Sequence, residues 1–315
     1  MRGVVAASVA DRPLRLGTRG SALALAQANA VAKLIGGAEV VPIKTSDNQD
    51  KRGPRTQGGD KARFVREIER ALLGGEVDLG VHSAKDLPTD LPDGLELAGV
   101  PEREDPRDAY IGHVDSLGAV QEGSRIGTSS LRRRSQILAR RPDLDVVELR
   151  GNVDTRLARY EAGDFDGLVL AVAGLRRLGR AEEIAFPIQP DECVSAPGQG
   201  AIAIEARRED DRAVTAVESI TDRGALGTLS AERSLVAALD ASCNTPLGAS
   251  ATLEQGGRMR LRAFCGLPDG SEWLRDELEE DASDPAGLGV ALAERMKATG
   301  ATDILERAES MAVGR

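Results

Sequence analysis

The sequence is poor in the residues that build metal centres and disulfide scaffolds. Its 315 residues include 3 cysteines and 2 histidines. Cys193, Cys243 and Cys265 are too few and too widely spaced for a disulfide framework or a zinc site. With only His82 and His113 available, a multi-histidine metal centre is excluded, so we expect no metal. Such cysteine usage is typical of reduced cytosol and predicts a cytoplasmic protein.

Long apolar segments are also missing. No uncharged apolar run approaches the roughly 18 residues that a membrane-spanning helix needs, so we expect no membrane association. Segment 1–10 has one arginine ahead of a brief apolar stretch, which predicts a ragged N-terminus rather than a signal peptide. The scarcity of aromatic residues, at 2%, and the lack of an apolar surface stripe predict a monomer.

The charge balance argues against nucleic acid as a partner. Acidic residues outnumber basic ones by 51 to 41, which gives a net charge of -10, whereas nucleic-acid proteins present basic surfaces and aromatic stacking residues. The basic residues comprise 35 arginines and 6 lysines. A salt-adapted or GC-biased source is one explanation for this ratio. The other is the ability of guanidinium to bind carboxylates or phosphates bidentately, so the positions of the arginines matter.

The first third of the chain alternates between strands and helices. It is predicted to contain, in order, a strand at 14–18, a helix from Ser21 to Gly36, a strand at 39–45, a mobile loop at 46–60, a helix at 61–73 and a strand at 77–81. Such alternation predicts an α/β sheet with parallel strands.

A weak internal repeat indicates two similar α/β lobes. The segment 16–21 (LGTRGS) is echoed at 126–130 (IGTSS), and 75–81 (GEVDLGV) is echoed at 163–169 (GDFDGLV). Proline- and glycine-marked segments at 101–106 and 195–200 are the predicted crossings between the lobes. We therefore expect domain 1 at 1–101 with 201–220, domain 2 at 106–196, and a small α+β domain 3 at 221–315 that ends in a helix near 285–298.

Both echoed turns place hydroxyl groups and backbone amides at the start of a helix, an arrangement that binds anions. These hydroxyls, which can equally serve as N-caps, are Thr18, Ser21, Thr128, Ser129 and Ser130.

Arginines accumulate around the same turns, although a run of charge is usually a solvated face. They are Arg15, Arg19, Arg132, Arg133, Arg134, Arg150, Arg156, Arg176 and Arg177. Arg132 and Arg133 fall in the first turn of a predicted helix, where a cation opposes the helix dipole. Their cost needs an offsetting partner, and a polyanionic ligand in the cleft would provide one.

The segment 81–88 (VHSAKDLP) directly follows a strand. Ser83, Lys85 and Asp86 are therefore expected at the carboxyl edge of a sheet, where open α/β folds bind ligands. Beside an arginine-lined cleft, positive neighbours would lower the pKa of Asp86 and keep its carboxylate ready to stabilise a cationic intermediate. The alternative is a Lys-Asp surface pair in a turn before proline. His82 is interpreted as structural.

Cys243 differs in setting from the other two thiols. It belongs to 240–248 (DASCNTPLG), a predicted loop, where a thiolate can anchor a ligand covalently or can be incidental. Cys193 and Cys265 adjoin Val194 and Phe264 and are interpreted as packing residues.

Eight motifs together resemble those of the porphobilinogen deaminase (hydroxymethylbilane synthase) family. They occur in the family's order between about residues 14 and 267: LGTRGSALA, VHSAKDLP, EREDPRDA, GTSSLRR, LRGNVDTR, AGLRRLG, PGQGA and SCNTPLG. The resemblance implies two domains like type II periplasmic binding proteins and a small α+β C-terminal domain. It also implies a dipyrromethane cofactor bound by a thioether to Cys243. The implied reaction of haem and porphyrin biosynthesis joins four porphobilinogen molecules head to tail, with loss of ammonia, into hydroxymethylbilane.

The resemblance also implies roles for single residues. Asp86 would be the catalytic carboxylate. The carboxylate-binding arginines would be Arg15, Arg19, Arg132, Arg133, Arg150, Arg156 and Arg177. Further cofactor or substrate contacts would be Ser21, Ser83, Lys85, Thr128, Ser130 and Gln199, and Lys61 and Phe64 would belong to a flexible active-site loop.

A non-catalytic, two-lobed binding protein for carboxylate ligands is the competing hypothesis. The presence of both Asp86 and Cys243 in their full motifs favours the enzyme.

Overall fold

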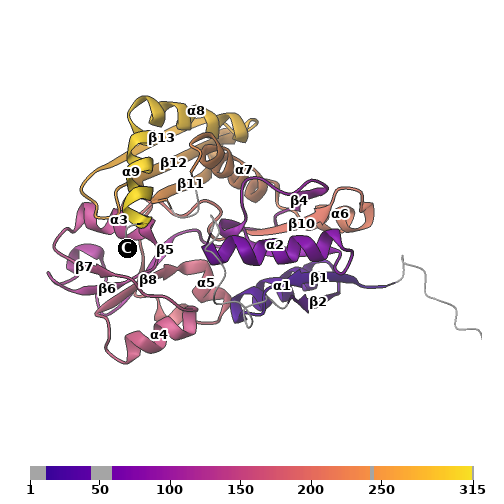
Figure 1. The fold of residues 1–315 in the computed structure, drawn as a ribbon, viewed down its shortest axis with the longest axis horizontal. Coiled ribbons are helices and arrows are strands. Elements are labelled where there is room, and N and C mark those ends of the chain that lie inside the picture. The colour runs from indigo at the N-terminus through magenta and orange to yellow at the C-terminus, as the bar shows by residue number, and fades with distance from the viewer. Residues whose placement is uncertain (1–11, 44–58, 242–244, 314–315) are drawn as a thin grey trace, which may run out of the picture.

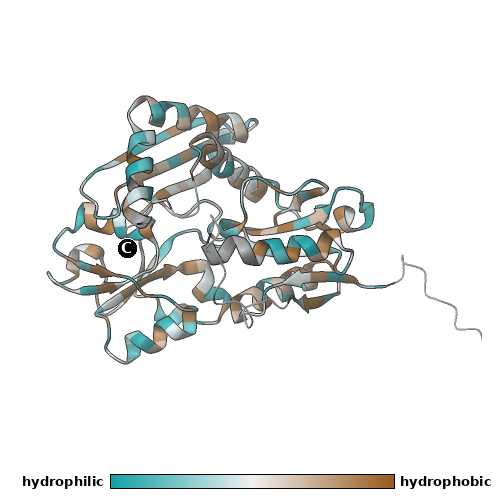
Figure 2. Cartoon of the chain, viewed as in Figure 1, coloured by the Kyte–Doolittle hydropathy of each residue, from teal (hydrophilic) through white to brown (hydrophobic). Residues whose placement is uncertain are grey.

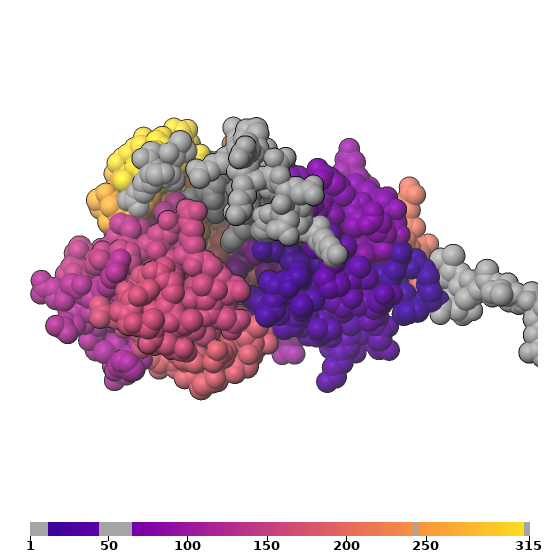
Figure 3. Space-filling view, turned by 60° about the horizontal axis from the view of Figure 1, so that its bottom comes forward, coloured from indigo at the N-terminus to yellow at the C-terminus, as the bar shows by residue number. Residues whose placement is uncertain are grey.

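The computed structural model describes residues 12–43, 59–241 and 245–313, with the side chains of 59–64 and 312–313 outside the description. Two α/β lobes lie side by side, and a smaller domain of strands and helices adjoins both (Figure 1). Figure 3 shows the first lobe in indigo and the second in magenta. The predicted α/β class with a small α+β domain is confirmed. Within the described residues, no helix is long and apolar enough to cross a membrane.

The first lobe is built on a five-stranded sheet of order β2-β1-β3-β10-β4. β1 runs parallel to β2 and β3, whereas β10 is antiparallel to β3 and β4. The strands are β1 (Leu14–Thr18), β2 (Ala38–Pro42), β3 (Leu79–Ser83), β4 (Leu95–Gly99) and β10 (Ile202–Arg207). The helices are α1 (Ala22–Leu34), α2 (Gly59–Leu73) and α6 (Asp211–Glu218).

Helices α1 and α2 cover the first sheet because their apolar residues meet its buried strands. On α1, Ala28 and Val31 pack in one cluster with Leu16 of β1. At Gly80 of β3, a Cβ atom would come within 2.9 Å of Ile68 on α2, so glycine permits this close approach. β3 begins at Leu79, two residues later than predicted.

The second lobe repeats the strand order as β7-β6-β8-β5-β9, again with the fourth strand antiparallel to the third. The strands are β5 (Asp108–Ile111), β6 (Arg125–Gly127), β7 (Asp145–Val147), β8 (Gly167–Ala171) and β9 (Phe186–Pro187). The helices are α3 (Leu131–Arg140), α4 (Val153–Glu161) and α5 (Val172–Arg177). The echoed sequences therefore occupy equivalent places, at β1 and β6 and at β3 and β8. Figure 2 shows hydrophobic residues concentrated in the strands of the lobes.

The chain passes between the lobes twice, over 100–107 from β4 to β5 and over 188–201 from β9 to β10. Strand β10 thus returns to the first sheet after the second is complete. Contacts between α1 and α5 also bring the lobes together. Short 3-10 turns lie at Ala84–Asp86, Leu117–Ala119, Ala181–Glu183 and Gln255–Gly257.

The smaller domain packs three helices against an antiparallel sheet of order β11-β12-β13. The strands are β11 (Leu247–Glu254), β12 (Arg258–Gly266) and β13 (Trp273–Asp281), and the helices are α7 (Arg223–Ala238), α8 (Pro285–Ala298) and α9 (Ala301–Val313). The sequence analysis missed α9 and β13. Strand β13 gives a weak apolar signal because it is rich in acidic residues. Two of these, Glu277 and Glu279, pair with Arg260 and Arg258 of β12.

Candidate active site

The carboxyl edge of the first sheet forms a small hollow beside Asp86. Strand β3 ends at Ser83, and the 3-10 turn η2 (Ala84–Asp86) follows directly. The hollow has a volume of about 70 Å³ and is lined by Arg19, Ser21, Leu23, Ala24, Gln27, Val65, Val81, His82, Ser83 and Asp86. The fold thus brings together Arg19, Ser21, Ser83 and Asp86, which come from two separate motifs.

Gln27 is a site residue that the sequence analysis missed. It is buried on α1, and its Oε1 accepts a hydrogen bond from the Ser83 hydroxyl at 3.0 Å. Ser21, on the same wall, caps α1 by accepting a hydrogen bond from the Ala24 amide at 3.3 Å. The signal for Gln27 was a lone amide on the buried face of an alanine-rich helix.

A larger hollow of about 420 Å³ lies between β13 and α8. Among its charged residues, Arg295 pairs with Asp276 at 2.8 Å, and Arg275 donates to carbonyl groups of 190–191. Volume alone would favour this hollow. The chemistry favours the smaller one, because it gathers Asp86, Arg19 and hydroxyl groups at a sheet edge.

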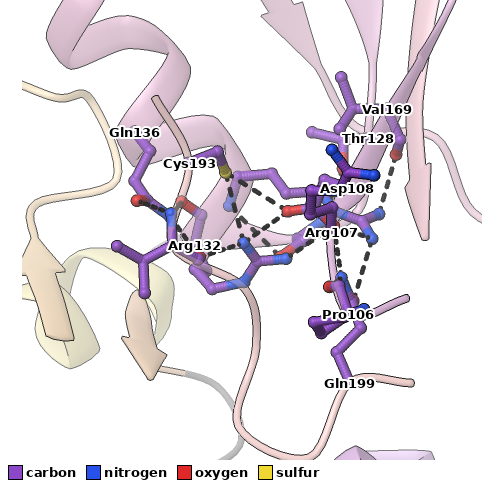
Figure 4. Close-up of polar contacts among 12 residues, drawn as sticks. Pro106, Arg107, Asp108, Thr128, Arg132, Gln136, Val169, Cys193 and Gln199 are labelled. Carbon is purple, nitrogen blue, oxygen red and sulfur yellow. Dashed lines mark hydrogen bonds and ion pairs between the residues drawn. The ribbon is translucent and has the colours of Figure 1, made fainter. Parts of the chain in front are cut away.

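Gln199 connects the Asp86 turn to the second lobe, and Figure 4 shows its contacts on the side of Pro106 and Asp108. Its Oε1 accepts hydrogen bonds from Lys85 Nζ at 3.3 Å and from Arg133 at 3.4 Å. Its Nε2 donates to Asp108 Oδ1 at 2.8 Å and to the Pro106 carbonyl at 2.7 Å. Both ends of this buried amide are therefore engaged within the chain, and the cofactor or substrate contact that the family resemblance implies for Gln199 stays a prediction.

Asp108 supplies a counter-charge for Arg132 and Arg133, and Figure 4 shows it beside Arg132. The three side chains are almost fully buried, and Asp108 lies 2.7 Å from Arg132 and 2.8 Å from Arg133. Burial alone would raise the pKa of Asp108, but the two guanidinium groups lower it well below its usual range. The carboxylate of Asp108 thus offsets the charge of both arginines inside the chain, and their contact with ligand carboxylates stays a prediction. Both arginines also donate to backbone carbonyls, Arg132 to Val194 and Arg133 to Val169.

The hydroxyl groups at the start of α3 act locally. Thr128 accepts a hydrogen bond from the Ser130 amide at 3.3 Å, and Ser130 caps α3 by accepting one from the Arg133 amide at 3.4 Å. The capping alternative therefore accounts for these bonds of Thr128 and Ser130.

Arg156 and Arg177 have a different environment from Arg132 and Arg133. Arg156 donates to the Gly151 carbonyl at 2.8 Å and to the Ser129 hydroxyl at 3.0 Å, and Arg177 donates to the Gly200 carbonyl at 2.7 Å. These acceptors are neutral. Burial, with the nearby charge of Arg133, lowers the pKa of Arg156 to about 10, and burial also lowers that of Arg177. An anion beside either group would offset this desolvation.

Arg19 is the predicted arginine that lines the hollow, and Arg15 and Arg150 pair with acidic residues elsewhere. Arg15 donates to Asp78, just before β3, with its Nη2 3.1 Å from Oδ1, so it sits at the opposite edge of the sheet from Asp86. Arg150 has an 80% exposed side chain and pairs with Glu148 at 2.7 Å. The structure does not bring either side chain to the hollow.

Two comparisons with known proteins identify the family. The "Porphobilinogen deaminase, dipyromethane cofactor binding domain" matches residues 14–215, and the "Porphobilinogen deaminase, C-terminal domain" matches 226–298. A porphobilinogen deaminase of Thermus thermophilus is 44% identical over 301 residues, covering 93% of this chain and 98% of that protein. This chain belongs to the porphobilinogen deaminase family. The resemblance seen in the motifs is confirmed.

Solved structures with a likeness to the chain include periplasmic solute-binding proteins. A Salmonella typhimurium periplasmic binding protein with high arginine specificity aligns at 14% identity with a TM-score of 0.36, covering 68% of this chain and 94% of that one. The L-cystine solute receptor of Neisseria gonorrhoeae aligns at 17% identity with a TM-score of 0.36, covering 69% and 90%.

The second lobe fits the cofactor that the porphobilinogen deaminase family model names. A dipyrromethane carries acetate and propionate groups, and the partly buried guanidinium groups of Arg156 and Arg177 bond here to neutral oxygens. Carboxylates are the ligands that such groups bind most strongly.

Three predicted residues cannot be placed. Cys243 and most of the predicted loop 46–60 lie outside the described residues, as do the side chains of Lys61 and Phe64, whose backbone forms the start of α2. The other two cysteines are buried, and burial raises the pKa of each thiol to about 12. Cys265 packs in an apolar cluster as predicted, whereas Cys193 also donates a hydrogen bond to Asp108 at 3.3 Å and accepts one from Arg132 at 3.4 Å.

Proposed function

We propose that this chain joins four porphobilinogen molecules head to tail into hydroxymethylbilane, with Asp86 as the central carboxylate. The transferase activity follows from family membership. The assignment of residues is ours, and the observation that carries it is the hollow where Asp86 meets Arg19, Ser21 and Ser83 at the carboxyl edge of β3.

Asp86 is suited to the charge that develops during the reaction. When the carbon–nitrogen bond of the aminomethyl group breaks and ammonia leaves, the remaining pyrrole is a cation, which an adjacent carboxylate stabilises. The new carbon–carbon bond then forms, and the proton lost from the attacking carbon passes to Asp86 or to solvent. Arg19 in the same hollow binds the substrate's carboxylates.

We propose that the second lobe holds the dipyrromethane. When bound, this cofactor supplies the terminal pyrrole carbon to which the first porphobilinogen is joined. Arg156 and Arg177 bind its carboxylates, and we propose that Cys243 is its attachment point. Arg132 and Arg133 stabilise this lobe through their ion pairs with Asp108.

We propose the same domain division as in the sequence analysis, in a monomeric, cytoplasmic enzyme that binds neither nucleic acid nor membranes. Light scattering on a sizing column tests the monomer directly.

Mass spectrometry and kinetics test the proposal together. Intact holoprotein should carry an adduct of dipyrromethane mass, and Cys243→Ala should lose it. Asp86→Asn should keep the adduct but lower kcat at least about 100-fold, because the transition-state cation loses its counter-charge. Asp93→Asn, an exposed carboxylate in the loop that follows, is the matched control and should keep kcat. An unmodified wild-type mass would favour the binding protein, and full turnover by Asp86→Asn would remove its assigned role.

A further inference from the structure

Helix α7 of the small domain packs one stripe of residues against the Asp86 turn. Ala225, Leu229 and Arg233 are spaced by four residues, so they lie on one face of the helix. Ala225 and Leu229 are buried in the same cluster as Ala84 and Leu87, which flank the Lys85–Asp86 pair. The turn therefore rests on a helix of another domain.

Arg233 continues this stripe and binds the loop that leaves the turn. Its guanidinium donates to three consecutive carbonyl groups: to Leu87 at 3.2 Å, to Pro88 at 2.7 Å and to Thr89 at 2.9 Å. The planar fork of donors in arginine can satisfy several acceptors at fixed angles, which the point charge of lysine cannot. The backbone immediately after Asp86 is thereby held in one direction.

Charged groups around Arg233 support this placement. Burial lowers the pKa of Arg233, and the charges of Glu205 and Asp90 act against that shift. Glu205 is itself fully buried and lies 2.8 Å from Nε2 of His82, on the strand that leads to the turn. Arg233 is thus set among groups of β10 and the 87–90 loop.

Glu232, the residue before Arg233 on α7, binds both crossings between the lobes. Glu232 accepts two hydrogen bonds from Arg103 of the first crossing, at 2.9 and 3.0 Å. It also accepts one from the Gly198 amide of the second crossing, at 2.7 Å. Arg233 therefore reaches the catalytic turn from a helix that is fixed to both crossings.

We infer that Arg233 is a positioning residue for the reaction, which orients the Asp86 carboxylate by holding the carbonyl groups of 87–89. It acts through the loop and has no contact with substrate. The inference rests on the proposed role of Asp86.

The test compares substitutions of two arginines of the small domain. Arg233→Met keeps much of the side-chain volume but removes the donors, and Arg233→Lys keeps the charge. The matched control is Arg275→Met, because Arg275 also bonds across a domain boundary to carbonyl groups, those of Pro190 and Asp191 in the second lobe. Turnover is measured per adduct-bearing molecule, and thermal unfolding is followed for each variant.

We expect Arg233→Met to lower kcat about 10-fold or more, with KM changed less than 3-fold. The kcat of Arg233→Lys should fall between those of Arg233→Met and wild type. Arg275→Met should keep kcat within 2-fold of wild type. Added methylguanidinium should restore part of the activity of Arg233→Ala. A merely structural role predicts instead a lower melting temperature with unchanged kcat per folded molecule.

Unchanged kcat in Arg233→Met and Arg233→Lys, or an equal loss in Arg275→Met, would overturn the inference. If Arg233→Met does not fold, the kcat of Arg233→Lys decides. Asp86→Asn is assayed in parallel: if it retains turnover, the proposed function of Asp86 fails. An inactive Asp86→Asn beside fully active Arg233→Met and Arg233→Lys removes only the role of Arg233.

Discussion

Two pairs of arginines in the second lobe differ in what balances their charge. Arg132 and Arg133 are almost fully buried and share the carboxylate of Asp108. Arg156 and Arg177 are partly buried and donate to carbonyl and hydroxyl oxygens, with their pKa values lowered by burial. The comparison shows that arginines from one set of motifs can differ in what compensates their charge. The charge of the first pair is offset by a carboxylate of the chain, whereas the second pair donates to neutral oxygens. The binding of a ligand's carboxylates by either pair stays a prediction.

The most damaging way to probe the first pair is Asp108→Asn. Two buried guanidinium groups would lose their counter-charge, which costs about 3–5 kcal/mol of unfolding free energy. Urea titration checks this value. The control, Asp164→Asn, breaks an exposed pair with Arg159 and should cost about 1 kcal/mol or less. A loss below 1 kcal/mol in Asp108→Asn would show that the first pair does not need its internal partner.

The second pair is probed by Arg156→Leu. Losing a charged hydrogen-bond donor to a ligand carboxylate costs about 1.5–3 kcal/mol, or roughly 10–100-fold in KM or in cofactor retention. The unfolding free energy should change little, because burial already disfavours this charge. Arg159→Leu, on the same helix, is the control and should leave KM unchanged. Equal KM values together with equal cofactor retention in both variants would contradict the contrast between the pairs.

The smallest effect concerns Arg15, whose partner is also internal. Burial acts to raise the pKa of Asp78, but hydrogen bonds from Arg15 and Arg12 lower it to about 2. A lowered folded-state pKa stabilises the fold above the unfolded value near 4, and this contribution disappears as the pH falls towards 2. Asp78→Asn should therefore lose about 1–2 kcal/mol at neutral pH, after allowance for the partial exposure of both arginines, and match wild type near pH 2. Unfolding curves between pH 2 and 7 measure this, and kcat should not change.

Local signals predicted the fold and site where the chemistry is local. Ser21 and Ser130 cap their helices as the turn motifs indicated, and Asp86 follows β3 at the edge that the strand pattern predicted. No local sequence pattern predicted the partner of Arg132. Asp108 lies 24 residues earlier, in an antiparallel strand that only the assembled sheet places beneath α3.

The positions of Arg233 and Gln27 were also beyond a linear reading. Arg233 meets the 87–89 loop across a separation of about 145 residues. Gln27 meets Ser83 across 56 residues. Such contacts depend on the packing of domains and helices, and no local pattern records them.

Strand β10 belongs to the first sheet but is synthesised after the whole second sheet, so synthesis order affects which lobe can fold first. The second sheet uses the continuous stretch 108–187, whereas β4 of the first sheet pairs, among the strands that the structure describes, only with β10 at 202–207. A chain emerging from the ribosome can therefore complete its second lobe before its first. The nascent protein carries an open sheet edge at β3 until residue 207 has cleared the exit tunnel. The lobe that holds Asp86, although begun first, is the later of the two to close.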